Sequence, residues 1–253
     1  MNSTDLSACA TLLAKADPER FRAVMAAPRQ ARAVLFPLYA ANAEVARAPW
    51  ASKEPMIVAM RLQWWRDVLA EIISGEPVRR HEVARPLGAA LSKEAAAVWD
   101  EAIDARLKDC EARPFENTSE LLLYLEQTGG SLLWAAALAL GAPEHDENPV
   151  RKIGMAQALA NYFCALPELE ARGKQPVPDG RPEALAELAR AQLQDWSRDR
   201  LSNASRIACI AAFAAKPRLK AAASKPERIA MGQLVQPLRE SFSLLKSSAF
   251  ARI

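Results

Sequence analysis

Two pairs of aspartates in this sequence have a spacing that could hold a metal ion. Asp100 and Asp104 are four residues apart, and so are Asp195 and Asp199. Carboxylates at positions i and i+4 share one face of a helix, and their oxygens are the ligands that a hard cation such as Mg²⁺ prefers. Solvated helix faces carry such pairs more often than metal sites do, and we expect solvated faces here.

The cysteines and histidines form no metal, redox or nucleophile motif. The four cysteines stand far apart, without a CxxC pair, at Cys9, Cys110, Cys164 and Cys209. Neither His81 nor His145 accompanies a motif such as GxSxG, and no glycine-rich phosphate loop occurs. We therefore expect reduced, mostly buried thiols in a cytoplasmic protein, without Ser-His-Asp or Cys-His catalysis.

The composition is that of a globular protein, with 51% hydrophobic and 25% charged residues among 253. The net charge of +3 is uneven, because residues 216–253 contain eight Lys or Arg and two Glu. A basic end can bind anionic lipid headgroups or nucleic acid, but no nucleic-acid motif accompanies it. We expect no nucleic-acid partner, and a peripheral membrane contact stays open beside a solvated face. No apolar run reaches the roughly 20 residues of a membrane-spanning helix, and no secretory signal is evident.

Local propensity favours helix almost throughout, because alanine is common, glycine is scarce and alternating β-branched runs are absent. The expected fold is all-α in a single domain over 1–253. Capping side chains predict helix starts at Asp17, Ser52 and Asn117, and Gly75 and Gly141 predict ends. The expected helices cover 5–16, 18–26, 29–48, 54–74, 83–112 with a break near Pro86, 118–140, 150–166, 182–200, 204–215 and 226–249.

Prolines interrupt this helical pattern in two ways. Pro37 and Pro237 lie inside expected helices, where each removes a backbone donor, and we expect a kink at both. Residues 171–182 are rich in proline and glycine and form the one long loop. A loop of this length often serves a site, although a plain connection is as common.

Three stretches carry a family resemblance through their order and spacing. They are Leu38-Tyr39-Ala40, the run RLQWWRD from Arg61 to Asp67, and QALANYFCALPELEARGKQPVP from Gln157 to Pro178. Together they resemble the squalene/phytoene synthase family of head-to-head prenyl diphosphate synthases, over roughly residues 18–200. The resemblance implies an isoprenoid (terpenoid) synthase-like helical bundle around a central cavity, with residues 216–253 as a basic C-terminal helical segment.

The resemblance also implies two DxxxD clusters that face each other and hold Mg²⁺ against the diphosphates. In this sequence the positions matching the first cluster are Ala46 and Trp50, and those matching the second are Ala165 and Leu169. Cys164 stands where the family has an arginine. Because no carboxylate remains at these positions, we expect no catalytic residue, no metal site and no cofactor.

Six side chains on the matching segments are candidates for contact with a ligand in the cavity: Tyr39, Glu44, Arg66, Gln157, Asn161 and Arg172. Gln157 and Asn161 are expected to face inward, where a polar contact with a neighbouring helix is a simpler role than ligand binding. Arg66 could pair with Asp67 and Glu71 on the helix surface or point into the cavity.

The aromatic and basic residues of the second and third stretches have similar alternatives. Trp64 and Trp65 are adjacent, so only one can face the core, and packing is favoured over a substrate platform. Arg172 and Lys174 keep part of the family's basic loop and could meet a phosphate, although exposed loop cations are the commoner case.

The resemblance favours a catalytically inactive homologue. The sequence is similar to the branch of the family that acts in the assembly of respiratory complex I. This similarity implies a respiratory-complex subunit or assembly factor as the binding partner. It also implies a location in the cytoplasm, possibly peripheral at the inner membrane. A related possibility is a lipid-binding scaffold, with an isoprenoid or quinone-like tail held between the helices at 29–48, 118–140 and 150–166.

The alternative is an active prenyl diphosphate transferase that depends on Mg²⁺. It would need a metal site rebuilt from Glu44, Glu168, Glu170 or a displaced aspartate pair. Losing four aspartates removes most of the charge stabilisation on which ionisation of a diphosphate depends.

Overall fold

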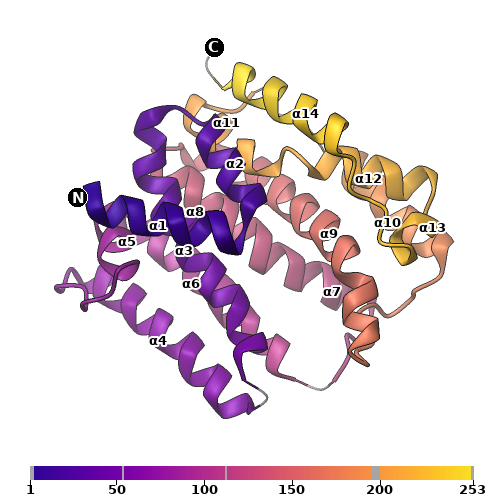
Figure 1. The fold of residues 1–253 in the computed structure, drawn as a ribbon, viewed down its shortest axis with the longest axis horizontal. Helices are drawn as coiled ribbons and strands as arrows, with labels where there is room; N and C mark the ends of the chain where they lie inside the picture. Colours follow the sequence, from indigo (N-terminus) through magenta and orange to yellow (C-terminus); the bar gives the residue numbers. More distant parts are fainter. Residues whose placement is uncertain (1–2, 53, 112, 195, 197–199, 252–253) are drawn as a thin grey trace.

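The computed structural model describes residues 3–52, 54–111, 113–194, 196 and 200–251, and all regular structure in these ranges is helical (Figure 1). The predicted all-α class is confirmed. The α-helices are α1 (Ser3–Ala16), α2 (Pro18–Ala26), α3 (Arg29–Ala51), α4 (Pro55–Ser74), α5 (Ala84–Ala90), α6 (Lys93–Ala105), α7 (Thr118–Leu125), α8 (Ser131–Ala139), α9 (Glu147–Ala171), α10 (Pro182–Gln194), α11 (Asn203–Ala208), α12 (Ala215–Ser224), α13 (Glu227–Ala230) and α14 (Pro237–Phe250). Shorter turns are η1 (Arg106–Cys110), η3 (Glu144–Asp146) and η4 (Cys209–Ala212), all 3₁₀, and η2 (Glu126–Gly130), a π turn.

Helix ends follow the predicted capping chemistry with one exception. Asp17 and Asn117 each accept a 2.9 Å hydrogen bond from the backbone amide three residues on, at the starts of α2 and α7. Before α4 the cap residue is Glu54, and Ser52 accepts an amide hydrogen bond within the preceding turn instead. Gly75 ends α4 with a φ of 82°, a conformation that favours glycine.

The predicted helix at 226–249 is wrong, because this stretch forms the two helices α13 and α14. Pro237 begins α14 and is therefore not an interior kink. At the first helical position its missing amide removes no hydrogen bond, and its fixed φ suits the helix. Pro37 does lie inside α3.

Other boundaries moved for similar local reasons. The α9 helix passes through Pro167 to Ala171, although the sequence predicted an end at 166. The proline removes one backbone hydrogen bond, while Phe163 and Leu166 keep the helix packed on the core. The stretch 83–112 divides into α5, α6 and η1, and 204–215 divides into α11, η4 and the start of α12.

Helices α3 and α9 lie on two sides of the centre of the molecule, and α8 packs against both (Figure 1). The π turn η2 touches α9 through two glycines. A Cβ atom on Gly154 would lie 2.4 Å from the carbonyl oxygen of Gly129, closer than real Cβ atoms come, so only glycine fits there without a shift. This contact fixes the continuous helix formed by α7, η2 and α8 against α9.

The burial of the cysteines agrees in part with the prediction of mostly buried thiols. Cys9 and Cys209 are buried, whereas Cys110 and Cys164 are half-buried, and none of these four forms a disulfide. Burial raises the pKa of the Cys9 thiol to about 12, so this thiol stays protonated. None of the helices in the described ranges has the length and apolar character needed to cross a bilayer.

Candidate functional site

The end of α3 meets the loop that follows α9 through one tryptophan. The Cζ atom of Arg172 lies 4.5 Å from the centre of the Trp50 ring, and Nζ of Lys174 lies 5.3 Å from it. Both distances are within the range of a cation–π interaction. Arg172 also forms an ion pair with Glu168, one turn back on α9. Arg172 and Lys174, which the sequence suggested as possible contacts of a phosphate, thus interact with the indole ring of Trp50.

This arrangement does not fit Mg²⁺. Ala46, Trp50, Ala165 and Leu169 supply no side-chain oxygen ligand, and the charged groups over the Trp50 ring, Arg172 and Lys174, are positive and repel a divalent cation. Across the described ranges, no three His, Cys, Asp or Glu side chains come together to hold a metal ion. The predicted pair of Asp195 and Asp199 lies outside those ranges.

The other aspartate pair has a structural partner. Arg66 donates through Nε and Nη2 to both carboxylate oxygens of Asp100, at 2.9 Å each, and through Nη1 to Asp104 at 2.7 Å. This fork joins α4 to α6. Pairing with Asp67 and Glu71 was one of the two alternatives that the sequence left open for Arg66, and the structure shows Asp100 and Asp104 as its partners instead. The aspartate pair is half-exposed but occupied by the guanidinium.

Gln157 and Asn161 make the contacts between helices that their spacing predicted. Gln157 donates to the carbonyl oxygen of Ala211 at 2.7 Å, and Asn161 accepts from Arg218 at 2.8 Å. Tyr39 is 1% exposed, and its hydroxyl has no hydrogen-bond partner within the described structure. Burial raises the pKa of Tyr39, which belongs to the core.

Asn161 is part of a buried charged group, here called the Arg218 cluster, that consists of Arg218, Glu240, Glu19 and Asn161. Arg218 donates to Glu240 at 2.9 Å and 3.1 Å, and it also pairs with Glu19. Burial acts to lower the pKa of Arg218, but hydrogen bonding to Glu240 and the charge of Glu19 raise it above its ordinary value. The cluster joins α2, α9, α12 and α14. Its members come from distant parts of the chain, and sequence reasoning missed it.

A second internal group joins η1 to α7. Tyr124 donates to Asp109 at 2.6 Å, and Arg106 donates to Asp109 at 3.2 Å and to the Tyr124 hydroxyl at 3.1 Å. Burial raises the pKa of Tyr124 despite the nearby charge of Arg106. Lys174 reaches the backbone oxygen of Asp109 at 3.4 Å, so the loop after α9 contacts this group too.

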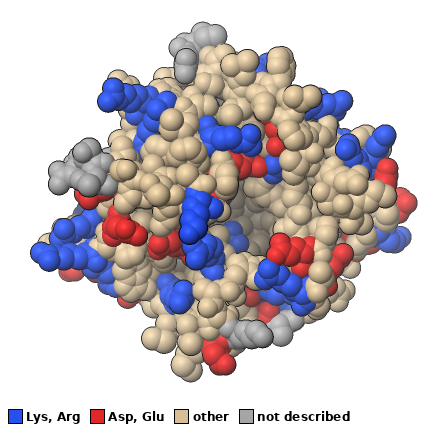
Figure 2. Space-filling view, in the orientation of Figure 1, with Lys and Arg blue, Asp and Glu red and all other residues tan. Residues whose placement is uncertain are grey.

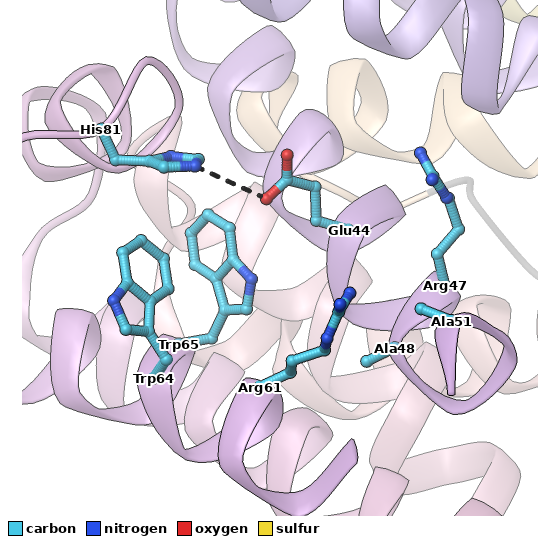
Figure 3. A pocket seen from close by; sticks show the side chains of 8 residues that line it. All are labelled: Glu44, Arg47, Ala48, Ala51, Arg61, Trp64, Trp65 and His81. Atoms are coloured by element: carbon cyan, nitrogen blue, oxygen red, sulfur yellow. Dashed lines mark ion pairs between the residues drawn. The ribbon is translucent and has the colours of Figure 1, made fainter. Parts of the chain in front are cut away.

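An open cleft lies between α3 and α4 (Figure 3). This α3–α4 cleft has a volume of about 470 Å³. It is lined by Glu44, Arg47, Ala48, Ala51, Arg61, Trp64, Trp65 and His81. Glu44, a candidate from the sequence for contact with a ligand, is one of these lining residues.

The wall of the α3–α4 cleft is aromatic. The ring centre of Trp64 lies 4.9 Å from that of Trp65 and 5.0 Å from that of His81. Trp65 is buried and reaches Trp99 in the core, while Trp64 stays half-exposed. This confirms that only one of the adjacent tryptophans faces the core.

The orientation of the His81 ring is fixed by the backbone. Its Nδ1 accepts from the amides of Val83 at 3.2 Å and Ala84 at 3.4 Å, so the proton of the neutral ring sits on Nε2. Nε2 lies 4.0 Å from a carboxylate oxygen of Glu44, too far for a direct hydrogen bond. Burial raises the pKa of Glu44. Both groups therefore keep hydrogen-bonding capacity directed into the opening.

Two cations line the cleft, and exposed apolar side chains lie on the same end of α4. Arg47 and Arg61 are exposed on α3 and α4. Along the same end of α4, Met56 and Met60 are 76% and 67% exposed, and Ile57 is also exposed. This mixture suits a ligand with acidic and apolar parts. Sequence reasoning used RLQWWRD as a family landmark, and no local signal linked it to a histidine 16 residues beyond Trp65.

Comparison with known proteins identifies the class of protein. The model of the squalene/phytoene synthase family matches residues 13–235, and the chain therefore belongs to that family. The fold agrees with a dehydrosqualene synthase crystal structure at a TM-score of 0.78, with 15% identity, over 98% of this chain and 96% of that one. The squalene synthase HpnC from Alicyclobacillus acidocaldarius aligns at a TM-score of 0.60 with 17% identity, over 98% and 92% of the chains. The predicted isoprenoid synthase fold is confirmed.

Curated relatives in animals match about two thirds of this chain. The human NADH dehydrogenase (ubiquinone) complex I, assembly factor 6, is 28% identical over 172 residues, which is 67% of this chain and 52% of the human protein. The Bos taurus protein of the same name and its Drosophila melanogaster homolog are each 28% identical, over 184 and 177 residues. The chain spans about half the length of these relatives.

Proposed function

We propose that this chain is a non-catalytic member of the squalene/phytoene synthase family that acts in the assembly of respiratory complex I, at the inner face of the membrane. One observation carries the proposal: Trp50, which the family resemblance matches to a metal-binding carboxylate, lies beneath the cations Arg172 and Lys174. The names of the animal relatives support the assembly role. Ionisation of a prenyl diphosphate needs neutralisation of its developing negative charge. The described residues at these positions supply no side-chain ligand for a metal ion that could neutralise it.

The α3–α4 cleft supplies a site for a protein partner in this role. Arg47 and Arg61 provide positive charge, and Trp64 and Trp65 provide apolar surface. An acidic segment with an apolar side chain would match both, with a polar atom between His81 and Glu44. Aromatic anchors beside arginines are typical of the residues that dominate binding energy in protein interfaces.

A lipid-binding scaffold is the second candidate, and a hollow favours it. Figure 2 shows the surface hollowed at its centre, over the region between α3 and α9 in Figure 1, with charged side chains of both signs on the rim. An isoprenoid or quinone-like tail would fit this location in the family fold. The candidate predicts a lipid that co-purifies with the folded protein and is identified by mass spectrometry after extraction.

The first test is release of diphosphate by the purified chain from farnesyl and geranylgeranyl diphosphate, with and without Mg²⁺, beside an active family enzyme. We expect no release above background from a protein whose circular dichroism shows it to be helical. Release that depends on Mg²⁺ would overturn the non-catalytic proposal in favour of a prenyl transferase.

The second test addresses the assembly role in cells. Deleting the gene is expected to lower the amount of assembled complex I and its NADH oxidation, while carotenoids and hopanoids stay unchanged. A copy with Arg47→Gln and Arg61→Gln should fail to restore the complex, whereas Lys15→Gln with Arg29→Gln, a pair of exposed cations away from the cleft, should restore it. Unchanged complex I after deletion would contradict the proposal.

A further inference from the structure

Helix α14 has a mainly polar face toward the bundle and an apolar face toward solvent, the reverse of the usual arrangement in a surface helix. The side toward the bundle is polar: Glu240 is 1% exposed, and Ser243 and Ser248 each donate a 2.7 Å hydrogen bond to a backbone carbonyl, of Phe213 and Ala26 respectively. The side toward solvent is apolar, since Leu238, Phe242 and Leu245 are 88%, 70% and 67% exposed. A helix that only covered a core would bury these three side chains and expose the serines.

The exposed apolar side chains form a continuous stripe. Positions 238, 242 and 245 are four and then three residues apart, so they project from one face of the helix. Met231 and Val235, in the segment before α14, are also exposed, at 61% and 49%. Apolar surface of this extent is costly in water and marks an interaction site. The α14 stripe is defined here as these five residues.

The charges around the α14 stripe are nearly all positive. Lys220, Lys225, Arg239 and Lys246 are exposed on this segment. Glu240 is buried against Arg218, which leaves Glu227 as the one exposed acidic residue among those described from 216 to 251. The basic composition of the segment is thus a basic surface, and its complement is an anionic one.

We infer that α14 lies flat on an anionic lipid bilayer, with the α14 stripe among the upper acyl chains and Arg239 and Lys246 at the headgroups. Basic side chains beside an exposed apolar helix face are the features of an interfacial helix. The polar inner face holds α14 on the bundle through the Arg218 cluster, so docking needs no rearrangement of the fold. Figure 1 shows α14 and α4 at opposite edges of the molecule, so docking of α14 leaves α4, one wall of the α3–α4 cleft, far from the membrane.

The test is co-sedimentation of the full chain with phosphatidylcholine vesicles, with and without phosphatidylglycerol. We expect binding that requires the anionic lipid and weakens with added salt. Phe242→Gln with Leu245→Gln should lower the partition coefficient about tenfold or more, because two apolar groups no longer enter the acyl region. Arg239→Gln with Lys246→Gln should lower binding to anionic vesicles and remove most of its salt dependence.

Met56→Gln with Met60→Gln is the matched control, because these side chains are as exposed as the α14 stripe but lie on α4. This control should bind vesicles as the unaltered chain does. Equal losses in the control and the α14 variant, or no binding to anionic vesicles, would overturn the inference. A dimer in the absence of lipid that Phe242→Gln converts to monomer would also overturn it and assign the stripe to a second copy. The inference rests on α14 alone, so it can fail while the assembly role holds.

Discussion

The Arg218 cluster and the α3–α4 cleft are both built from charged side chains, but they differ in how their polar groups are satisfied. Arg218 is buried and meets two carboxylates and an amide. In the cleft, Glu44 and His81 stop 4.0 Å apart, and Arg47 and Arg61 extend into solvent. The polar groups of the cluster are satisfied by one another, whereas polar groups in the cleft keep hydrogen-bonding capacity for a ligand or partner.

The difference separates stability from binding. A buried charge that has all its partners holds helices together and becomes a large liability when one partner is lost. A half-exposed charge contributes little to stability, and its change affects mainly what binds there. Variants in the Arg218 cluster should therefore change mainly stability, and variants in the α3–α4 cleft should change mainly binding.

The largest expected effect comes from Arg218→Met, which leaves Glu240 and Glu19 without their cation. We expect the free energy of unfolding to fall by about 3–5 kcal/mol, measured by urea denaturation. Arg61→Met in the cleft is the matched control and should change it by no more than about 0.5 kcal/mol. Similar losses from the two variants would remove the distinction between cluster and cleft.

Tyr124→Phe should lower the free energy of unfolding by about 1–3 kcal/mol. It deletes the donor to Asp109 and an acceptor of Arg106, and both partners are already sheltered from water. Tyr162→Phe, which loses a single 2.7 Å hydrogen bond to the carbonyl oxygen of Pro176, should cost less, about 1 kcal/mol. Thermal and urea unfolding of both variants would check the order, and the reverse order would contradict it.

Trp50→Ala is expected to lower the free energy of unfolding by about 1 kcal/mol. The half-exposed ring loses its interactions with Arg172 and Lys174, and such exposed contacts are individually weak. Met60→Ala, an exposed apolar truncation on α4, serves as the comparison and should be nearly neutral. A Trp50→Ala variant as stable as Met60→Ala would show that the cations do not hold the ring.

The smallest effect concerns the pH dependence contributed by Glu44. Because burial raises its pKa in the folded state, the folded chain holds this proton more tightly than the unfolded chain. The contribution of Glu44 to stability is therefore present at low pH and lost as pH rises from the unfolded pKa through the folded pKa. Glu44→Gln should flatten the stability–pH curve in that window and give a slight gain at neutral pH. A steeper curve for the variant would contradict the sign.

Helices were predictable where local chemistry decides them. Asp17 and Asn117 cap α2 and α7 with their own side chains, and Gly75 ends α4 through its own backbone. Boundaries failed where distant packing overrode a local signal. Pro167 normally favours a helix end, but the buried residues before it keep α9 continuous.

For the candidate site, the sequence indicates which matching positions have no carboxylate, but it does not indicate the cleft. Ala46, Trp50, Ala165 and Leu169 can be read from the order of the family-like stretches, as can the expectation that no metal binds. The cleft could not be predicted, because Glu44 and His81 are far apart in sequence and only the packing of α3, α4 and the turn before α5 brings them together.

The sequence by itself determined the helical class, the family and the missing carboxylates, because propensity and residue identity are local properties. It also determined that the segment 216–253 is basic. Only the tertiary structure decided that Arg218 and Glu240 of this segment are buried together while Leu238, Phe242 and Leu245 face outward. Which side of a helix meets the core depends on the helices packed against it, and those partners come from distant parts of the chain.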